Sequence, residues 1–329
     1  MDPLTQGVFG ASWAQSGASR AKLKAAALLG VASGIAPDLD VLIRSSSDPL
    51  LFLEFHRQFT HSFTFIPIGA LIVATVMHAW SRHQLSFRQS YQFCLLGYAS
   101  HGLLDACTSY GTQLLWPFSE MRVAWSNVSV VDPLFTLPII ALLLVSIRAA
   151  RVRYARLAAL WAIIYLAFGW LQNQRAAEAA EALAASRGHV ATRLETKPAL
   201  GTALLWKSIY EFDGRYYVDA LRPIFRVRVH PGESIAKLDL MAHFPWLDAT
   251  SQQAIDVERF RRVADDFLAL DDRAPNRIVD MRYSMVPNEI DAFWAIELDA
   301  GAARNAHVDF LITRERAPEQ LWRLLGMLF

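Results

Sequence analysis

Seven acidic and histidine side chains stand out in the first half of the sequence, because the segments around them are otherwise apolar. These residues are Asp38, Asp40, His56, His61, His101, Asp105 and Asp132. An ionisable side chain at membrane depth costs free energy unless it pairs with another group or binds an ion. Imidazole and carboxylate together are ligands that suit zinc, with manganese or iron as alternatives. The group therefore predicts a site for one or two divalent metal ions, with zinc as the first choice.

The spacing of the histidines indicates how they could reach one ion. His101 and Asp105 are four residues apart in an apolar segment, so a helix places both on one face, one turn apart. His56 and His61 are five residues apart and do not share a helix face, but a loop that enters a helix near Thr60 would bring them together. Both pairs are therefore expected to contribute metal ligands.

Asp38 and Asp40 follow Pro37 at the end of an apolar segment. A turning backbone there lets one carboxylate bind the ion while the other holds a histidine from behind, so both are expected at the metal. A bound metal would lower the pKa of a water that attacks an ester or a phosphodiester. Asp40 and Asp132 are expected to assist this step, and Arg57 to stabilise the negative charge that develops.

Each of these features also has a purely structural interpretation. Interfacial histidines such as His56 and His61 can bond backbone carbonyls, and the two aspartates after Pro37 can cap a helix in water. Arg57 can anchor the chain at the interface with its charge in water. A metal or catalytic site is favoured because the polar residues of four separate segments are predicted to meet at one face of the membrane.

The elements that carry these residues are predicted to form an α-helical membrane bundle of about five spans. Three segments approach the roughly 20 apolar residues that cross a bilayer, and these are Ser62–Trp80, Val128–Ile147 and Tyr154–Leu171. Two shorter segments, Ala25–Ala36 and Tyr91–Leu104, are expected as helices shielded inside the bundle. Residues 3–14 are uncharged and contain glycine and alanine, which predicts an N-terminal half-helix packed against it.

Basic residues beside these segments predict their orientation, because loops rich in lysine and arginine stay in the cytoplasm. Such residues occur in three places, at 20–24, at 82–88 and at 148–156. The alternation of spans then puts the candidate metal site, and everything after Leu171, on the opposite face. In a bacterium this predicts a multi-pass protein of the inner membrane with a periplasmic C-terminal part.

Charge divides the chain into two unlike parts. Only 20 of the first 171 residues are charged, against 43 of the last 158. We therefore expect a helical membrane domain with the metal site over 1–171, a helical stalk over 172–189 and a soluble α+β domain over 190–329. The net charge of +1 gives no reason to expect nucleic acid as a partner. Cys94 and Cys107 fit neither a disulfide framework nor a zinc finger.

The soluble domain is predicted from alternating, β-rich runs mixed with two helical patterns. The runs are Ala203–Phe212, Tyr216–Ala220, Phe225–Val229, Ile278–Tyr283, Phe293–Leu298 and His307–Thr313. The helical patterns are Val257–Leu270 and Pro318–Phe329, and Asp213-Gly214 is a hairpin turn signal. None of the histidines here has ligand spacing, so we assign this domain no chemistry.

Five short motifs, taken in order, resemble a known family. MDPLTQGVFGA at the start, PDLD at 37–40, HRQFTHS at 56–62, HGLLD at 101–105 and VVDP at 130–133 resemble the bacterial inner-membrane proteins of the membrane-bound metal-dependent hydrolase family, the LexA-regulated hydrolase-like family. The resemblance implies a helical membrane core, a divalent-metal site and hydrolase activity. It carries over to Asp38, Asp40, His56, His61, His101 and Asp105, with Asp132 and Arg57 beside them. Some members have histidine where this chain has Gln6.

The expected function is therefore an integral-membrane, metal-dependent hydrolase. Its substrate would be a lipid or a lipid-linked ester or phosphodiester in the surrounding bilayer, attacked by a metal-activated water. The alternative is a non-catalytic membrane scaffold with a structural metal site, whose soluble domain binds a protein partner that the sequence does not identify.

Overall fold

The computed structural model describes residues 1–313 and 317–328 and divides into two compact units. The first unit comprises Met1–Leu42, Phe55–Leu171 and Leu200–Ala203. The second comprises Ile43–Glu54, Gln172–Ala199 and Leu204–Phe329. The first is helical and apolar, and the second contains the β-strands that the sequence predicts for its later part.

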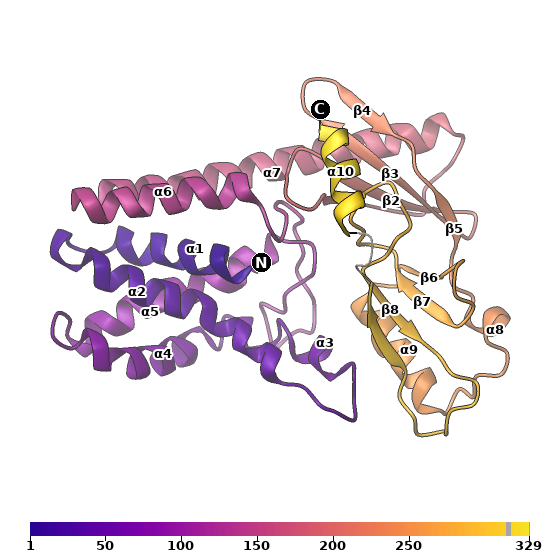
Figure 1. Ribbon diagram of the computed structural model, residues 1–329, viewed down its shortest axis with the longest axis horizontal. Coiled ribbons are helices and arrows are strands. Elements are labelled where there is room, and N and C mark those ends of the chain that lie inside the picture. Colours follow the sequence, from indigo (N-terminus) through magenta and orange to yellow (C-terminus); the bar gives the residue numbers. More distant parts are fainter. Residues whose placement is uncertain (314–316, 329) are drawn as a thin grey trace. The chain divides into compact units, whose positions relative to one another are not determined.

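Six longer helices begin in the first unit (Figure 1). They are α1 (Pro3–Ser16), α2 (Leu23–Ile35), α4 (Ile66–Ser81), α5 (Phe87–Ala106), α6 (Pro133–Ala149) and α7 (Arg153–Ser186). Short helical turns join them, namely η1 (Arg20–Lys22), η2 (Ala36–Leu42), α3 (Leu51–Phe55) and η3 (Phe59–His61). Helix α1 packs against α2, α5 and α6, and α5 also packs against α2 and α4. The expected N-terminal half-helix is thus α1, which lies inside this bundle.

The five expected spans are not supported. Among the described residues, two helices are long and apolar enough to cross a membrane, the continuous Arg20–Leu42 and α7. The pair Leu51–His61 and Ile66–Ser81, bent by 87°, would make a third. Helices α4 and α6 have 16 and 17 residues, so each extends only about 25 Å against a hydrocarbon core of about 30 Å. Helix α5 has 20 residues, but polar residues interrupt its apolar surface.

Glycines allow three helices to cross at close range. A Cβ on Gly30 of α2 would lie 2.7 Å from the carbonyl oxygen of Gly10 in α1, and a Cβ on Gly97 of α5 would lie 2.8 Å from the carbonyl oxygen of Gly30. Gly34, one turn further along α2, meets the backbone of Gln6 in the same way. Spacing small residues four apart brings helix backbones together in membranes. As a result, α2 is held close to the middle of α5 on one side and to α1 on the other.

The second unit contains two antiparallel sheets. The first has the order β1-β2-β3-β4 with β5 paired to β3, and the second has the order β6-β7-β8-β9. The strands are β1 (Arg193–Pro198), β2 (Trp206–Phe212), β3 (Arg215–Pro223), β4 (Val227–His230), β5 (Ser234–Ala236), β6 (Leu268–Leu270), β7 (Arg277–Asp280), β8 (Trp294–Glu297) and β9 (Asp309–Ile312). The helices are the later part of α7, α8 (Leu240–His243), α9 (Gln252–Val263) and α10 (Ala317–Leu328).

One helix prediction was wrong over its second half. Instead of continuing to Leu270, α9 ends at Val263, and strand β6 follows. The cause is local, since Asp265 and Asp266 have φ values of 49° and 60° and so leave the right-handed helical region. The predicted turn at Asp213-Gly214 is confirmed, because both residues have positive φ and join β2 to β3 with no further loop residue. Phe329, the last residue of the other helix prediction, lies outside the described residues.

The later part of α7 packs on the first sheet. Its Ala176 and Ala180 form a buried cluster with Trp206 and Leu221. Residues on the other face of that sheet, such as Ile209, share a core with the second sheet. The segment 172–189, expected as a stalk, thus contributes one layer of the second unit.

A buried lysine lies in the core between the two sheets. Lys207 of β2 is 4% exposed, and its Nζ donates hydrogen bonds to Ser284 Oγ at 2.8 Å and to the carbonyl oxygen of Glu289 at 3.2 Å. Burial lowers the pKa of Lys207 to about 7, although Asp280 and Glu233 partly oppose the shift. Between this pKa and the ordinary lysine value of 10.5, the unfolded chain binds a proton at this residue that the folded chain does not.

We therefore expect Lys207 to make the free energy of unfolding of the second unit rise with pH between about 7 and 10.5. Lys207→Met should remove this contribution, so the variant should gain stability over the wild type by a few kcal/mol at pH 7 and by much less near pH 10.5. Urea midpoints of the full chain in nanodiscs, followed by tryptophan fluorescence at several pH values, measure the difference. A difference between the two proteins that does not change with pH would contradict the expectation.

Candidate metal centre

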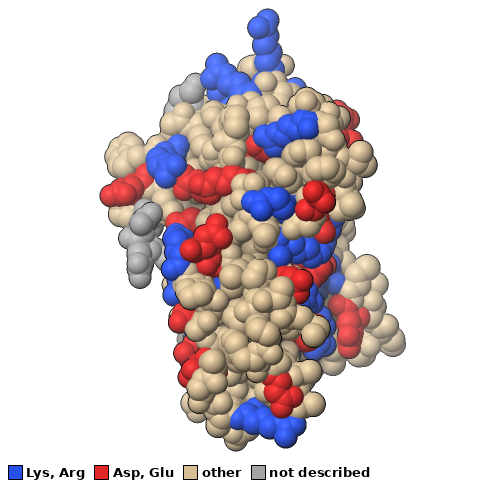
Figure 2. Space-filling model, turned by 90° about the vertical axis from the view of Figure 1, so that its right-hand side faces the viewer, with Lys and Arg blue, Asp and Glu red and all other residues tan. Residues whose placement is uncertain are grey.

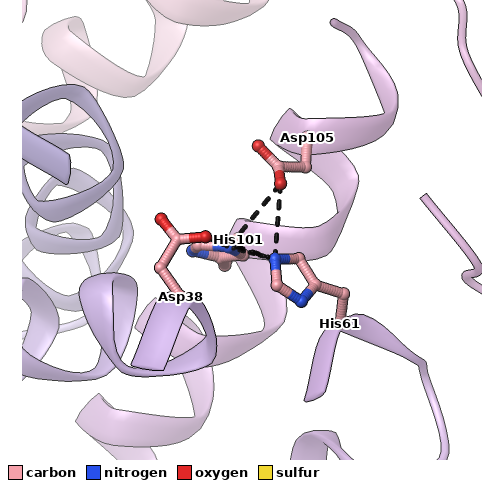
Figure 3. Close-up of side chains that lie close together, drawn as sticks. All are labelled: Asp38, His61, His101 and Asp105. Carbon is pink, nitrogen blue, oxygen red and sulfur yellow. Dashed lines mark hydrogen bonds and ion pairs between the residues drawn. The ribbon is translucent and has the colours of Figure 1, made fainter. Parts of the chain in front are cut away.

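Four side chains from three elements converge on one point in the first unit (Figure 3). They are Asp38 of η2, His61 of η3, and His101 and Asp105 of α5. One ligand atom from each lies within 4.8 Å of the ligand atoms of the other three. The four-residue spacing places His101 and Asp105 one helical turn apart, as their order in the sequence predicts.

The two imidazole rings meet at the centre of this group through their Nε2 atoms, with their planes 69° apart. The Nε2 atoms of His61 and His101 are 2.9 Å apart. Each lies 3.4 Å from Asp38 Oδ1, while Asp105 Oδ2 lies 3.3 Å from His61 Nε2 and 3.8 Å from His101 Nε2. Two nitrogens and two carboxylate oxygens therefore surround a common centre.

Hydrogen bonds on the far sides of the rings determine which nitrogen carries the proton. His101 Nδ1 lies 2.6 Å from the carbonyl oxygen of Gly34, which can only accept, so this nitrogen is the donor. His61 Nδ1 lies 2.9 Å from Thr60 Oγ1, whose own proton goes to Asp40 Oδ2 at 2.8 Å, so this nitrogen also donates. In the neutral rings both Nε2 lone pairs then point at each other, an arrangement that is relieved by a proton on one Nε2 or by a metal ion that binds both.

Asp40 lies behind His61. Its Oδ2 is 3.3 Å from His61 Nδ1 and also accepts the backbone N–H of Arg57 at 3.0 Å. Its Oδ1 lies 2.7 Å from His56 Nδ1. A second group of possible ligand atoms consists of Asp38, Asp40 and His56, but both oxygens of Asp40 already bond neighbouring groups. Asp40 is therefore placed to orient His61, as carboxylates behind metal-bound histidines do.

Asp105 is held by a set of donors on the side away from the histidines. Its Oδ1 accepts hydrogen bonds from Gln6 Nε2 at 2.9 Å and from Arg57 Nη2 at 3.3 Å, and it also pairs with the amino group of Met1. Its Oδ2 is buried and makes no hydrogen bond within the described residues, although Arg57 Nε lies 3.0 Å away. A buried carboxylate oxygen without a hydrogen bond, close to two imidazoles, is suited to bind a cation.

Arg57 adopts an unusual backbone conformation at this site. Its φ is 65°, a left-handed value that is uncommon outside glycine. The side chain is 4% exposed, donates to Thr108 Oγ1 at 3.0 Å and lies over the ring of Tyr110. Its positive charge is thus fixed beside Asp105 inside the protein.

Asp132 is not brought into either group. It lies at the start of α6, where Oδ1 accepts the backbone N–H groups of Leu134 and Phe135, and Oδ2 accepts the hydroxyl of Tyr165 at 2.9 Å. These contacts make it a helix cap. Its place in the sequence, just before Pro133, is typical of that role.

Several supporting groups were not found from the residue pattern. Thr60, Thr108 and the carbonyl of Gly34 all contact the group, and no motif distinguishes them from other polar or small residues. Gln6 could have been identified from the sequence, because some members of the family that the sequence resembles have histidine at this position. Here its amide lies against Asp105 in the position where such a side chain would reach the site.

Access to the four residues is narrow. The side chains of His61, His101 and Asp105 are completely buried, and that of Asp38 is 15% exposed. Of the four side chains, Asp38 is therefore the one that a molecule entering the site would contact first.

Comparison with known proteins connects the first unit to a family. The family model described as YdjM inner membrane protein matches residues 1–176. The uncharacterized protein YfhP of Bacillus subtilis is 27% identical over 117 residues, which cover 36% of this chain and 35% of that relative. The match thus spans about a third of the relative's length. No solved structure matches the chain.

Proposed function

The chain belongs to the YdjM inner membrane protein family, and we propose that it is a metal-dependent hydrolase of the inner membrane. Asp38, His61, His101 and Asp105 would hold the divalent ion. The substrate is a lipid or a lipid-linked ester or phosphodiester. The observation that carries the proposal is the pair of Nε2 atoms 2.9 Å apart, whose lone pairs face each other because both Nδ1 atoms donate elsewhere.

The donor set favours zinc. Two imidazole nitrogens and two carboxylate oxygens match its usual ligands, and manganese or iron also accept this combination. A cation at this centre would supply Lewis-acid chemistry and would lower the pKa of a nearby water. One ion satisfies the four residues, because Asp40 and His56 of the second group already bond each other.

The protein's own groups have distinct roles in this proposal. Asp38, the one partly exposed member, lies where substrate enters. Asp40 keeps His61 oriented, and Arg57 keeps Asp105 charged and adds positive charge where a negative oxygen would form. Asp132 has no role, since it caps α6.

The proposal includes a periplasmic position for the site. Asp38 lies in the first turn of η2, just after the C-terminal end of α2, and Asp105 lies at the C-terminal end of α5. The basic residues of η1 lie at the other end of the Arg20–Leu42 helix. The basic end is expected in the cytoplasm. A site at the opposite ends would meet lipid headgroups of the outer leaflet, and α7 would lead the second unit out on the same side.

A second candidate function is a non-catalytic scaffold with a structural metal. The observation that favours it is the burial of the site, because four protein ligands can close a tetrahedral shell and three of them are completely buried. The second unit would then bind a protein partner. X-ray absorption of the metal-loaded protein separates the two functions, since a catalytic ion keeps an exchangeable water and a structural ion has only protein ligands.

The metal content of the purified protein tests the site itself. In detergent, the wild type should carry about one equivalent of zinc or manganese by plasma mass spectrometry. Asp38→Asn and the double variant His61→Ala/His101→Ala should lose the metal. The first removes the negative charge of one ligand, and the second removes both imidazole ligands. Asp132→Asn is the matched control, a buried aspartate outside the group, and should keep the metal. A wild type that binds no divalent ion after reconstitution would overturn the proposal.

Asp40→Asn tests the supporting carboxylate. The amide keeps the shape of the side chain but removes the charge behind His61, so metal affinity should fall about 10- to 100-fold without loss of the bound stoichiometry at saturation. Competition with a fluorescent chelator gives the affinity. An unchanged affinity would mean that Asp40 does not orient the ligand.

Hydrolysis tests the enzyme directly. Metal-loaded protein in nanodiscs should cleave fluorescent phospholipids or lipid-linked phosphodiesters, and the chelated protein and Asp38→Asn should not. If metal-loaded protein with an exchangeable water cleaves none of these substrates, the proposed substrate class is wrong.

A further inference from the structure

The β3–β4 hairpin of the second unit exposes an apolar tip. Pro223 pairs with Val227, so residues 224–226 form the turn. Phe225 at the tip is 97% exposed, and Val227 is 47% exposed. A phenylalanine this exposed is unusual in a folded domain, because burying its ring against protein or lipid is favourable.

Contacts along β3 determine where this tip lies relative to α7. Near the far end of the helix, Arg187 pairs with Asp219 at 2.7 Å. Leu221 shares a cluster with Ala176 and Ala180 in the middle. Successive positions along β3 therefore meet α7 at positions progressively closer to its apolar part.

The last contact is at the end of the apolar segment itself. Gln172 is 1% exposed, and its Nε2 donates a hydrogen bond of 3.1 Å to the carbonyl oxygen of Pro223. Gln172 directly follows Leu171, and no charged residue occurs from Leu157 to Leu171. Trp170 and Leu171 are 55% and 50% exposed, as expected for side chains that face lipid. The base of the hairpin is thus fixed to the residue that directly follows the uncharged, apolar part of α7.

Arginines accompany the apolar tip. Arg226 and Arg228 are exposed on either side of Val227. Figure 2 shows basic side chains at the top of the space-filling view, the end at which Figure 1 places β4. An exposed aromatic ring with neighbouring arginines is the combination that enters the headgroup region of an anionic bilayer, the ring among the acyl chains and the charges at phosphate depth.

From this position and this composition, we propose that the β3–β4 hairpin is a second membrane contact, which inserts Phe225 into the interface and binds anionic phospholipid headgroups through Arg226 and Arg228. The hairpin would hold the second unit against the same bilayer that α7 crosses. This inference depends on the membrane position of α7 and not on the metal centre, so either can fail without the other.

Spin labelling of the full chain tests the inference. A nitroxide at Phe225→Cys, in a background with the buried Cys94 and Cys107 replaced by alanine, is placed in nanodiscs that contain phosphatidylglycerol. Power saturation compares collision with oxygen, which concentrates in lipid, and with a water-soluble nickel chelate. Val190→Cys is the matched control, because Val190 is also apolar and 80% exposed but follows the far end of α7, about 20 Å along the helix from Gln172.

The oxygen-to-nickel collision ratio should be several-fold higher at 225 than at 190. It should fall towards the value at 190 when phosphatidylcholine replaces phosphatidylglycerol, or in Arg226→Gln/Arg228→Gln. A tip as accessible to nickel as residue 190 would overturn the inference. A tip that stays inserted in both lipids and in the arginine variant would overturn the recognition of anionic headgroups.

Discussion

The close crossing of α1, α2 and α5 is the constraint on which the candidate site depends. Gly34 is at its centre, because the missing side chain lets the backbone of Gln6 approach and the carbonyl oxygen accepts the hydrogen bond of His101. A larger residue at position 34 would push α1 away from α2. It would also disturb the hydrogen bond that keeps the proton of His101 on Nδ1. Gly34 thus determines both the close approach of α1 to α2 and the hydrogen bond that fixes the His101 ring.

Burial of charge is the second constraint, and it explains the number of polar residues around the centre. A buried carboxylate such as Asp105 needs several donors to offset the loss of water. Gln6, Arg57 and the Met1 amino group supply them at Oδ1. Oδ2 makes no hydrogen bond within the described residues, and its charged neighbour is Arg57 Nε at 3.0 Å. This oxygen, which also lies near His61 and His101, therefore keeps lone pairs that a cation can use.

The sequence predicts the parts of this structure that depend on local spacing. The four-residue separation of His101 and Asp105, the Asp213-Gly214 turn and the change from apolar helices to a β-rich part all follow from periodicity, turn chemistry and composition. The number of spans does not, because it depends on where helices break and on how much polar surface α5 carries inside the bundle. The cap that Asp132 forms on α6 could not be distinguished from a catalytic acid by sequence, because the type and position of this residue fit both roles.

The break before α4 shows why fold and site cannot be separated in this unit. Backbone that leaves the helix at membrane depth must find partners within the protein. Here the N–H of Arg57 is bonded to Asp40, its carbonyl accepts from Gln113, and Phe63 bonds the carbonyl of Leu114. The 87° bend that these bonds support turns His61 towards α5. A straight helix would satisfy its own backbone hydrogen bonds but would carry His61 away from His101. The break in the helix is therefore what allows the side chain of His61 to reach the site.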